Sequence, residues 1–191
     1  MRVIAGLYKG RKLAPPAWPG LRPTSDRLKE SVFAILAPVV EGARVLDGFA
    51  GSGALGIEAM SRGAAEVVFV DEDRRAAALI ERNLAHCGIA GGYVMIRAAF
   101  GRALRQLPDG LRFDLALLDP PYDHAGLDAV LAAAVGRMAP GGVIALEHAT
   151  RRAAPARAGG FVAARDVTAG DGTVTFYREA AGEAPREREG A

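Results

Sequence analysis

The chain has 191 residues, one cysteine and a formal net charge of +2 at pH 7. This length predicts one domain with at most a small appendage, and the lone Cys87 excludes both a disulfide framework and a zinc site built from several cysteines. No apolar run approaches the ~18 residues of a membrane span. The basic N-terminus MRVIAGLYKGRKL also lacks the apolar stretch of a secretory signal, so we expect a cytoplasmic protein with no membrane partner.

Basic side chains are concentrated at the start of the chain. Residues 1–30 carry seven Lys or Arg side chains and only two acidic ones, so the rest of the chain is mildly acidic. Such a cluster is typical of a protein with an anionic partner such as nucleic acid. A solvated surface hairpin would carry the same charges, and charge alone does not separate the two interpretations.

The first forty residues predict a small extension. Residues 2–7 and 11–14 are expected to pair as a hairpin, and prolines and glycines then interrupt regular structure up to Pro23. Ser25 or Asp26 caps the helix that follows, and Pro38 ends it. The apolar positions of this helix share one face and are Leu28, Val32, Ile35 and Leu36.

From Arg44 onward, apolar strands alternate with helices. The expected strands are 44–47, 66–71, 93–96, 113–118 and 143–147, followed by an antiparallel pair, 161–166 and 173–177. The expected helices are one that follows the glycines of 51–56 and runs through Met60, then 74–87, then 127–138, which stops at Pro140-Gly141-Gly142. This alternation predicts an α/β fold with a mostly parallel sheet covered by helices on both faces.

These elements also predict the domain organisation. We expect a basic hairpin and helix over residues 1–40 and a main domain over residues 41–179. The tail over residues 180–191 is rich in charge, Gly and Ala and has no large apolar side chain, so we expect it to be disordered.

A glycine-rich turn follows the strand 44–47. Its Gly51-x-Gly53-x-x-Gly56 pattern matches the dinucleotide fingerprint, and Asp71 ends the next strand, where an acid would hold ribose hydroxyls. This segment permits a nicotinamide-dinucleotide site, and also a plain turn that packs helix against strand. Asp47 at the strand end would repel a pyrophosphate and favour a cationic amino-acid group, which is the pattern of S-adenosylmethionine sites.

A second motif, Asp119-Pro120-Pro121-Tyr122, follows the strand 113–118 at its carboxyl end, where ligands bind in open α/β sheets. Two prolines stiffen the turn, so the Asp119 carboxylate and the Pro120 carbonyl become fixed acceptors for the two N–H groups of an exocyclic amine. Tyr122 offers a ring on which a base can stack, a contact worth about 1–3 kcal/mol. The motif predicts methyl transfer to a base amine, driven by positioning and electrostatics.

The two motifs together resemble the class I, S-adenosylmethionine-dependent amino-group methyltransferases. Three further segments are similar to the bacterial 16S ribosomal RNA guanine-N2 methyltransferases, in register from about residue 1 to 178: Lys9-Gly10-Arg11-Lys12-Leu13, Leu21-Arg22-Pro23-Thr24-Ser25-Asp26-Arg27 and Phe49-Ala50-Gly51-Ser52-Gly53-Ala54-Leu55-Gly56. The resemblance implies a Rossmann-like fold with a seven-stranded, mostly parallel sheet and a small N-terminal hairpin and helix. It implies methylation of the N2 amine of a guanine in 16S ribosomal RNA, within a 30S particle or an assembly intermediate.

The resemblance also implies which residues form the site. The cofactor S-adenosylmethionine, with S-adenosylhomocysteine as its product, would be held by Asp47, Phe49, Gly51, Ser52, Gly53, Asp71, Glu72, Ala99 and Phe100. The target guanine would be held by Asp119, Pro120, Pro121 and Tyr122, and the RNA by Lys9, Arg11, Lys12, Arg22, Thr24 and Arg27. No metal is expected, because the three histidines lack metal-ligand spacing, and we expect a monomer.

Two positions depart from the family pattern. Gly48 stands where the family commonly has Leu, which a turn tolerates. Ala99 stands where the family tends to carry Asp or Asn for the adenine amine, so backbone atoms of Ala99 and Phe100, or stacking by Phe100, would replace that contact. Trp18 could stack on a flipped base, although in a Pro-rich loop packing against its own domain is the commoner role.

Three other functions fit part of the sequence. A DNA or other RNA amino-group methyltransferase shares the motif at 119–122, but no separate target-recognition domain is evident. A nicotinamide-dependent oxidoreductase would use residues 51–71 and leave residues 119–122 without a role. A non-catalytic RNA-binding factor on a methyltransferase scaffold would bind cofactor or RNA without turnover.

Overall fold

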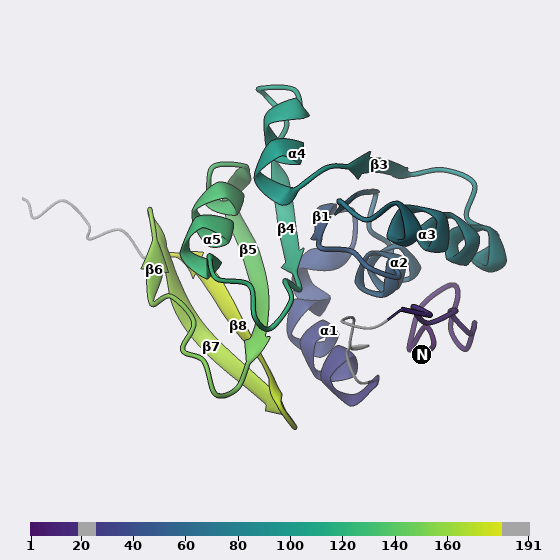
Figure 1. Cartoon of the computed structure of the whole chain (residues 1–191), viewed down its shortest axis with the longest axis horizontal. Helices are drawn as coiled ribbons and strands as arrows, with labels where there is room; N and C mark the ends of the chain where they lie inside the picture. The colour runs from purple at the N-terminus through teal and green to yellow at the C-terminus, as the bar shows by residue number, and fades with distance from the viewer. Residues whose placement is uncertain (19–25, 181–191) are drawn as a thin grey trace, which may run out of the picture.

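The structure is a computed structural model that describes residues 1–18 and 26–180. Within these residues, eight strands form one sheet in the order β3-β2-β1-β4-β5-β8-β7-β6 (Figure 1). The strands are β1 Arg44–Gly48, β2 Glu66–Asp71, β3 Tyr93–Arg97, β4 Phe113–Leu118, β5 Met138–Ala149, β6 Arg157–Ala158, β7 Phe161–Ala169 and β8 Gly172–Glu179. The first five are parallel to one another, and β8, β7 and β6 extend the sheet in antiparallel fashion.

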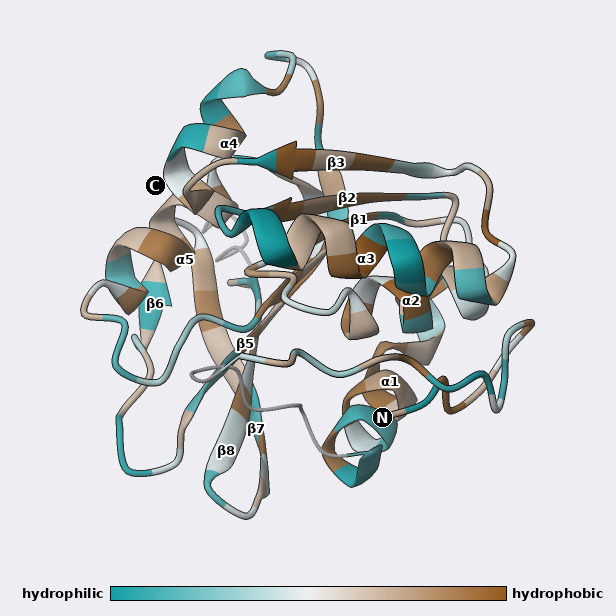
Figure 2. Cartoon of the chain, turned by 45° about the vertical axis from the view of Figure 1, so that its right-hand side comes forward, coloured by the Kyte–Doolittle hydropathy of each residue, from teal (hydrophilic) through white to brown (hydrophobic). Residues whose placement is uncertain are grey.

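Five helices cover the two faces of this sheet. They are α1 Asp26–Val40, α2 Ala54–Ser61, α3 Arg74–Cys87, α4 Phe100–Gln106 and α5 Leu127–Val135. Neighbouring residues of β1 show how the faces divide, since Val45 packs in a core with α1, α2 and α3, and Leu46 packs in a second core with α4 and α5. Figure 2 shows hydrophobic colouring along the central strands and mixed colouring along α3, as a half-buried helix requires.

The chain changes direction across the sheet between β1 and β4. From β1 the chain proceeds outward through β2 to β3, and it then returns to place β4 on the other side of β1. In parallel sheets, the loops after two such strands diverge and leave a crevice at their carboxyl ends. The turns after β1 and β4, which carry the two sequence motifs, therefore face the same crevice.

The expected α/β fold, with a mostly parallel sheet and helices on both faces, is confirmed. The strand count differs by one, because the two-residue β6, which is too short to give a periodic signal, pairs with β7. Helix α4 was not expected, and its seven residues bury only Phe100, Ala103 and Leu104.

Two predicted helix ends are wrong. Pro38 does not end α1, which runs on to Val40 because that side chain is buried in the core. Helix α5 ends at Val135, not at Met138, because Gly136 caps it and Met138 already pairs with Phe113 as the first residue of β5. In both places tertiary packing outweighs the local signal.

The N-terminal segment, residues 1–18, pairs over a shorter stretch than the expected hairpin. Arg2 and Lys12 form one antiparallel bridge, and the Val3 amide donates to the Arg11 carbonyl at 3.0 Å. Val3 and Leu13 are buried in the core that α1 and α2 share. The expected cap at Ser25 and most of the expected tail lie outside the described residues, as do Arg22 and Thr24.

Among the helices of the described ranges, none has both the length and the apolar character that crossing a membrane requires.

Candidate active site

The turn after β1 is built on backbone conformations that side chains rarely adopt. Gly51 and Gly53 have φ values of 56° and 75°, and Phe49 has a φ of 62°. Glycine takes such values without a steric penalty, whereas a phenylalanine is strained there. Strain of this kind is concentrated at ligand sites, and here it accompanies a Phe49 ring that stacks on Phe100 with the ring centroids 5.1 Å apart.

Asp47, near the end of β1, supports this turn through a hydrogen bond to its backbone. Its side chain is 1% exposed, and its Oδ2 accepts a hydrogen bond from the Gly56 amide at 2.8 Å. Burial raises the pKa of Asp47 to about 8, with the Gly56 amide acting against that shift and the charge of Asp71 adding to it. Through the hydrogen bond to Gly56 the carboxyl group holds the start of α2 in place.

Asp71, at the end of β2, connects two loops. Its Oδ2 accepts from the Gly51 amide at 2.9 Å, and its Oδ1 accepts from the Asp73 amide at 2.9 Å. A carboxylate oxygen can accept two hydrogen bonds, so each oxygen keeps acceptor capacity beyond these contacts. Asp71 thus ties the glycine turn to the start of α3 and still presents acceptors to a ligand.

A third contact holds the glycine turn from α3. Asn83 is 1% exposed, and its Nδ2 donates to the Ser52 carbonyl at 2.9 Å and to the Ala14 carbonyl at 3.2 Å. Its Oδ1 accepts from the Ala14 amide at 2.9 Å. One buried amide therefore joins the glycine turn to the N-terminal segment, a link that the sequence analysis did not include.

The turn after β4 is joined to β1 and β5. The Asp119 amide donates to the Gly48 carbonyl at 3.2 Å, and the His124 amide closes the turn on the Pro121 carbonyl at 2.8 Å. The Tyr122 hydroxyl donates to Glu147 Oε1 of β5 at 3.3 Å. Arg152 adds a hydrogen bond to the His124 carbonyl.

A cavity of about 580 Å³ lies between the two turns. It is lined by Trp18, Phe49, Val70, Asp71, Glu72, Asp73, Arg75, Ala98, Ala99, Phe100, Gly101, Asp119, Pro121, Asp123, His124, Gly126, Ala129, Val130 and Ala133. Seven predicted site residues are in this lining: Phe49, Asp71, Glu72, Ala99, Phe100, Asp119 and Pro121. The structure therefore brings the predicted cofactor and target residues to one cavity.

The other predicted residues of the two turns are not part of that lining; they are Asp47, Gly51, Ser52, Gly53, Pro120 and Tyr122. One of them is tied to a cavity residue, because the Gly51 amide donates to Asp71. The sequence pattern that identified them, glycines and prolines after buried strands, predicts the conformation of the backbone. It does not predict which side chains face the cavity.

Trp18 lines the cavity and also packs on its own domain. The Arg75 guanidinium lies over the indole ring, with Cζ 4.8 Å from the centroid, and Arg75 pairs with Asp73 at 2.6 Å. The hydrogen bond from Arg75 lowers the pKa of Asp73. Sequence reasoning missed Arg75, since arginines in the first turn of a helix match no motif.

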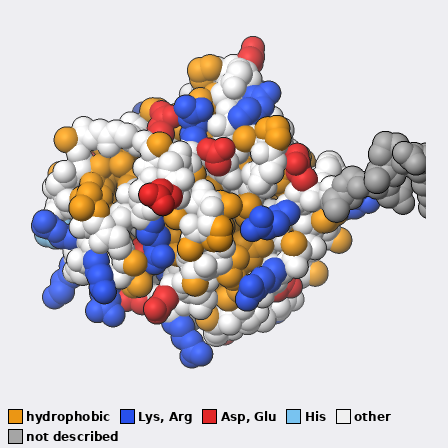
Figure 3. Space-filling view, turned by 180° about the vertical axis from the view of Figure 1, so that it is seen from behind, with side chains coloured by type: hydrophobic (Ala, Val, Ile, Leu, Met, Phe, Trp, Pro, Cys, Tyr) orange, Lys and Arg blue, Asp and Glu red, His pale blue; other side chains and the backbone are white. Residues whose placement is uncertain are grey.

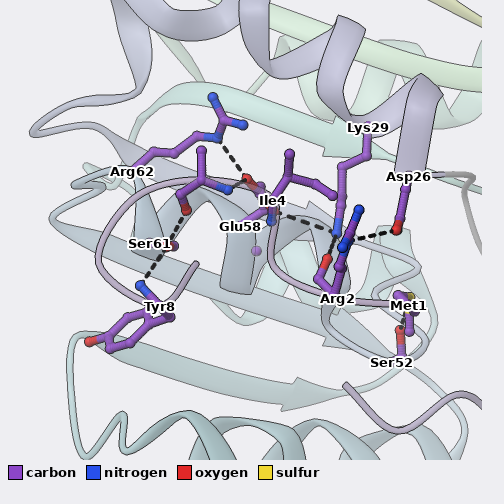
Figure 4. A network of polar contacts seen from close by, with 12 residues as sticks. Met1, Arg2, Ile4, Tyr8, Asp26, Lys29, Ser52, Glu58, Ser61 and Arg62 are labelled. Carbon is purple, nitrogen blue, oxygen red and sulfur yellow. Dashed lines mark hydrogen bonds and ion pairs between the residues drawn. The ribbon is translucent and has the colours of Figure 1, made fainter. Parts of the chain in front are cut away.

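The N-terminal segment is fastened to α2 by a buried ion network (Figure 4). Glu58 is fully buried, and its Oε2 accepts from the Ile4 amide at 2.7 Å and lies 3.5 Å from Lys29 Nζ. Its Oε1 accepts from the Ala5 amide at 3.1 Å and from Arg62 Nε at 2.8 Å. Burial lowers the pKa of Lys29, and Glu58 acts against that shift.

The basic residues of the N-terminal segment point outward from this network. Lys9, Arg11 and Lys12 are exposed, as is Arg27 on the first turn of α1. Seen from behind, several Lys and Arg side chains line the lower left edge of Figure 3, the side that carries α3 and the N-terminal segment in Figure 1. In the described parts of the chain, no group of three or more His, Cys, Asp or Glu side chains is placed to hold a metal ion.

Comparison with known proteins gives a consistent result. The family model described as "Conserved hypothetical protein 95" matches residues 1–178. YlbH of Bacillus subtilis is 37% identical over 182 residues, which are 94% of this chain and 99% of that protein. Ribosomal RNA small subunit methyltransferase D of Escherichia coli is 36% identical over 186 residues, which are 96% of this chain and 92% of that protein.

A solved structure supports the same assignment. The Escherichia coli protein yhhF matches with a TM-score of 0.82 at 33% sequence identity, over 95% of this chain and 99% of that chain. The resemblance found in the motifs is thus confirmed along nearly the whole length. The chain belongs to the family described as conserved hypothetical protein 95, the family of the bacterial small-subunit ribosomal RNA methyltransferases.

Proposed function

We propose that this protein transfers a methyl group from S-adenosylmethionine to the exocyclic N2 amine of a guanine in 16S ribosomal RNA, within a 30S particle. The observation that carries the proposal is the single cavity shared by Asp71, at the end of β2, and Asp119, at the end of β4. Relatives named as small-subunit ribosomal RNA methyltransferases support the substrate class. The choice of a base amine is supported by the acceptors of the turn after β4.

The size of the cavity and part of its lining support the assignment of this cofactor. Its volume of about 580 Å³ lies within the roughly 300–1,000 Å³ of small-molecule sites. Asp71 and Glu72 would accept from the ribose hydroxyls, and Asp71 retains acceptor capacity for that purpose. The apolar rings of Phe49 and Phe100 would contact the adenine.

The glycine turn would receive the methionine part of the cofactor. Gly51 and Gly53 carry no side chain, so a ligand can approach the main chain closely there. Asp47 and Ser52 would keep this turn in shape. Asp47 accepts from the Gly56 amide, and the Ser52 carbonyl accepts from the buried Asn83. With Ala99 in place of an acid or amide, the adenine amine would be met by backbone atoms of Ala99 and Phe100.

The turn after β4 would hold the target guanine. Bound S-adenosylmethionine supplies an electrophilic methyl group. The Asp119 carboxylate and the Pro120 carbonyl would each accept one N–H of the amine, which directs the nitrogen lone pair toward that group. The prolines fix both acceptors before the substrate arrives, so little reorganisation is needed in the transition state. Tyr122 would offer its ring to the base.

The N-terminal segment would hold the RNA. Lys9, Arg11 and Lys12 are exposed on a loop whose base is locked by Glu58, so their charges project from a rigid support. Contacts of this kind position RNA through its phosphates and do not read its sequence. We include Arg27 in the same proposed surface, and we propose that Arg22 and Thr24, which lie outside the described residues, also contact the RNA.

The experiment that tests the proposal is direct. The purified protein is incubated with radiolabelled S-adenosylmethionine and with 30S particles that lack the methyl group that the protein is proposed to add. The RNA is then digested to nucleosides. We expect the label in N2-methylguanosine, and none in particles that already carry the modification. Label in another base would move the proposal to a different amine, and cofactor binding without any label would support a non-catalytic factor.

A further inference from the structure

The hydroxyl of Tyr122 reaches a buried acid on the neighbouring strand. Glu147 is 6% exposed, and its Oε1 accepts from the Tyr122 hydroxyl at 3.3 Å. In the parallel pairing of β4 with β5, Leu118 is opposite Leu146, so Glu147, within β5, lies at the level at which Asp119 follows β4. The acid is therefore at the carboxyl edge of the sheet, beside the turn that carries Asp119 and Tyr122.

Gly172, the first residue of β8, closes the other side of this contact. A Cβ atom added there would lie 2.6 Å from the Tyr122 hydroxyl oxygen and 3.1 Å from Glu147 Oε1. A real Cβ atom does not approach an oxygen to 2.6 Å, so any other residue would displace Tyr122 or Gly172 itself. The hydroxyl thus occupies the space that a side chain at position 172 would fill.

The backbone at position 172 does not itself require glycine. Gly172 is not among the glycines with positive φ, and it pairs with Ala149 of β5 and Ala169 of β7 in ordinary strand register. An alanine would suit such a backbone and would lower the conformational entropy of the unfolded chain. The close approach of Tyr122 is the feature of the described structure that accounts for a glycine there.

We infer that Glu147 and Gly172 are positioning residues for Tyr122, the acid by binding its hydroxyl and the glycine by leaving room for it. This inference rests on the proposed function, in which the Tyr122 ring receives the target base. A tyrosine side chain can rotate about the Cα–Cβ bond, and a hydroxyl held at its far end restricts that rotation, although the ring can still turn about its own long axis. The place of the ring is then fixed before the base arrives, which lowers the entropic cost of reaching the reactive geometry.

A rescue experiment tests this directly. The variants are Gly172→Ala, Tyr122→Phe and the double variant. Gly160→Ala is the control, because a Cβ atom added at Gly160 would meet no atom within 4 Å and its φ is not positive. We expect Gly172→Ala to lower kcat for 30S methylation about tenfold or more while KM for the cofactor stays unchanged. The double variant should be more active than Gly172→Ala alone, because removing the hydroxyl makes room for the methyl group.

A second pair of variants covers the case in which Gly172→Ala does not fold. Glu147→Gln keeps an oxygen acceptor for the hydroxyl and should retain most of the activity, whereas Glu147→Ala should lower kcat with little change in cofactor KM. Equal losses in the two Glu147 variants, or a double variant no better than Gly172→Ala alone, would overturn the inference.

The thermal unfolding midpoint separates this inference from the proposed function. If Tyr122 fills the space at Gly172, the double variant should regain part of the midpoint that Gly172→Ala loses, whatever the reaction is. Absence of methylation by the wild-type protein together with this regain would contradict the proposed function alone. Absence of the regain in a protein that methylates 30S particles would contradict the positioning role alone.

Discussion

The turn after β1 is fixed by buried hydrogen bonds, whereas the turn after β4 is fixed by proline rings and by a contact from β5. In the first, Asp47 holds the Gly56 amide and Asp71 holds the Gly51 amide. In the second, two prolines restrict the backbone and Glu147 holds Tyr122. Both turns border the same cavity, although the chain stiffens them by different means.

The two turns are fixed by different means because they offer different groups to a ligand. A glycine turn gives a ligand access to the main chain, but it is flexible and needs acids and amides behind it. A Pro-Pro turn presents a carboxylate and a carbonyl at fixed positions with less support. The strand-end acids follow the same division, because Asp47 is buried and holds the backbone, whereas Asp119 lines the cavity.

The largest effect is expected from removing the acid of the second turn. Asp119→Ala should lower methyl transfer by about 10²–10³-fold, the usual cost of losing one pre-organised charge partner of the reacting group. The fold should be unaffected, since the side chain lines the cavity and the prolines still hold the turn. Single-turnover assays with Asp109→Ala, in an exposed loop, as the control would measure this. Near-normal turnover would remove Asp119 from the mechanism.

The attachment of the N-terminal segment is expected to depend on the buried acid of α2. Glu58→Ala should lower the free energy of unfolding by about 3–5 kcal/mol, because it removes the buried acid that pairs with the buried Lys29. It also leaves the amides of Ile4 and Ala5 without their acceptor. Urea denaturation against Glu66→Ala, whose pair with Arg44 is partly exposed and worth less than about 1 kcal/mol, checks this. Equal losses of unfolding free energy in Glu58→Ala and Glu66→Ala would show that the buried network stabilises the fold no more than a partly exposed ion pair does.

The buried acid of the first turn should also leave a signature in the pH dependence of stability. Asp47 has a raised pKa of about 8 against an ordinary 3.8. Between these two values the folded chain keeps a proton that the unfolded chain has released, so stability falls as pH rises, by at most about 1.4 kcal/mol per pH unit.

Asp47→Asn removes this titration and keeps an oxygen for the Gly56 amide. The variant should therefore gain stability relative to wild type as the pH is raised from about 5 to about 8. Denaturation curves at both pH values measure that gain. An identical pH dependence in the two proteins would mean that Asp47 is ionised in the folded chain.

The smallest effect is expected outside both turns, on the RNA side. Replacing Lys9, Arg11 and Lys12 together by Gln should lower the slope of log affinity against log salt by about 2, as expected when up to three phosphate contacts are lost. Filter binding of 16S RNA over a salt series measures the slope, with Arg102, Arg105 and Arg112 neutralised as the control. An unchanged slope would show that Lys9, Arg11 and Lys12 do not contact RNA phosphates.

The sequence was informative where a residue type has one common structural use. Glycines and prolines after apolar runs located both turns, and β2 and β4 were predicted with the bounds that the structure has. Packing across distant segments was not predictable. Asn83 joins Ser52 to Ala14, and Glu147 meets Tyr122 and Gly172, through contacts that leave no spacing pattern. The continuation of α1 past Pro38 and the early end of α5 likewise depend on which side chains the core buries.

The central claim is that the side of the cavity with the glycine turn and Asp71 binds the cofactor, whereas the turn after β4 holds the target base. Calorimetric binding of S-adenosylhomocysteine tests this claim most directly. Asp71→Asn should weaken binding by about tenfold or more, since a charged acceptor for hydroxyl groups is worth about 1.5–3 kcal/mol. Asp119→Asn, its matched partner on the other side of the cavity, should bind the same ligand within about threefold of wild type. Equal weakening in the two variants, or a loss confined to Asp119→Asn, would contradict the account.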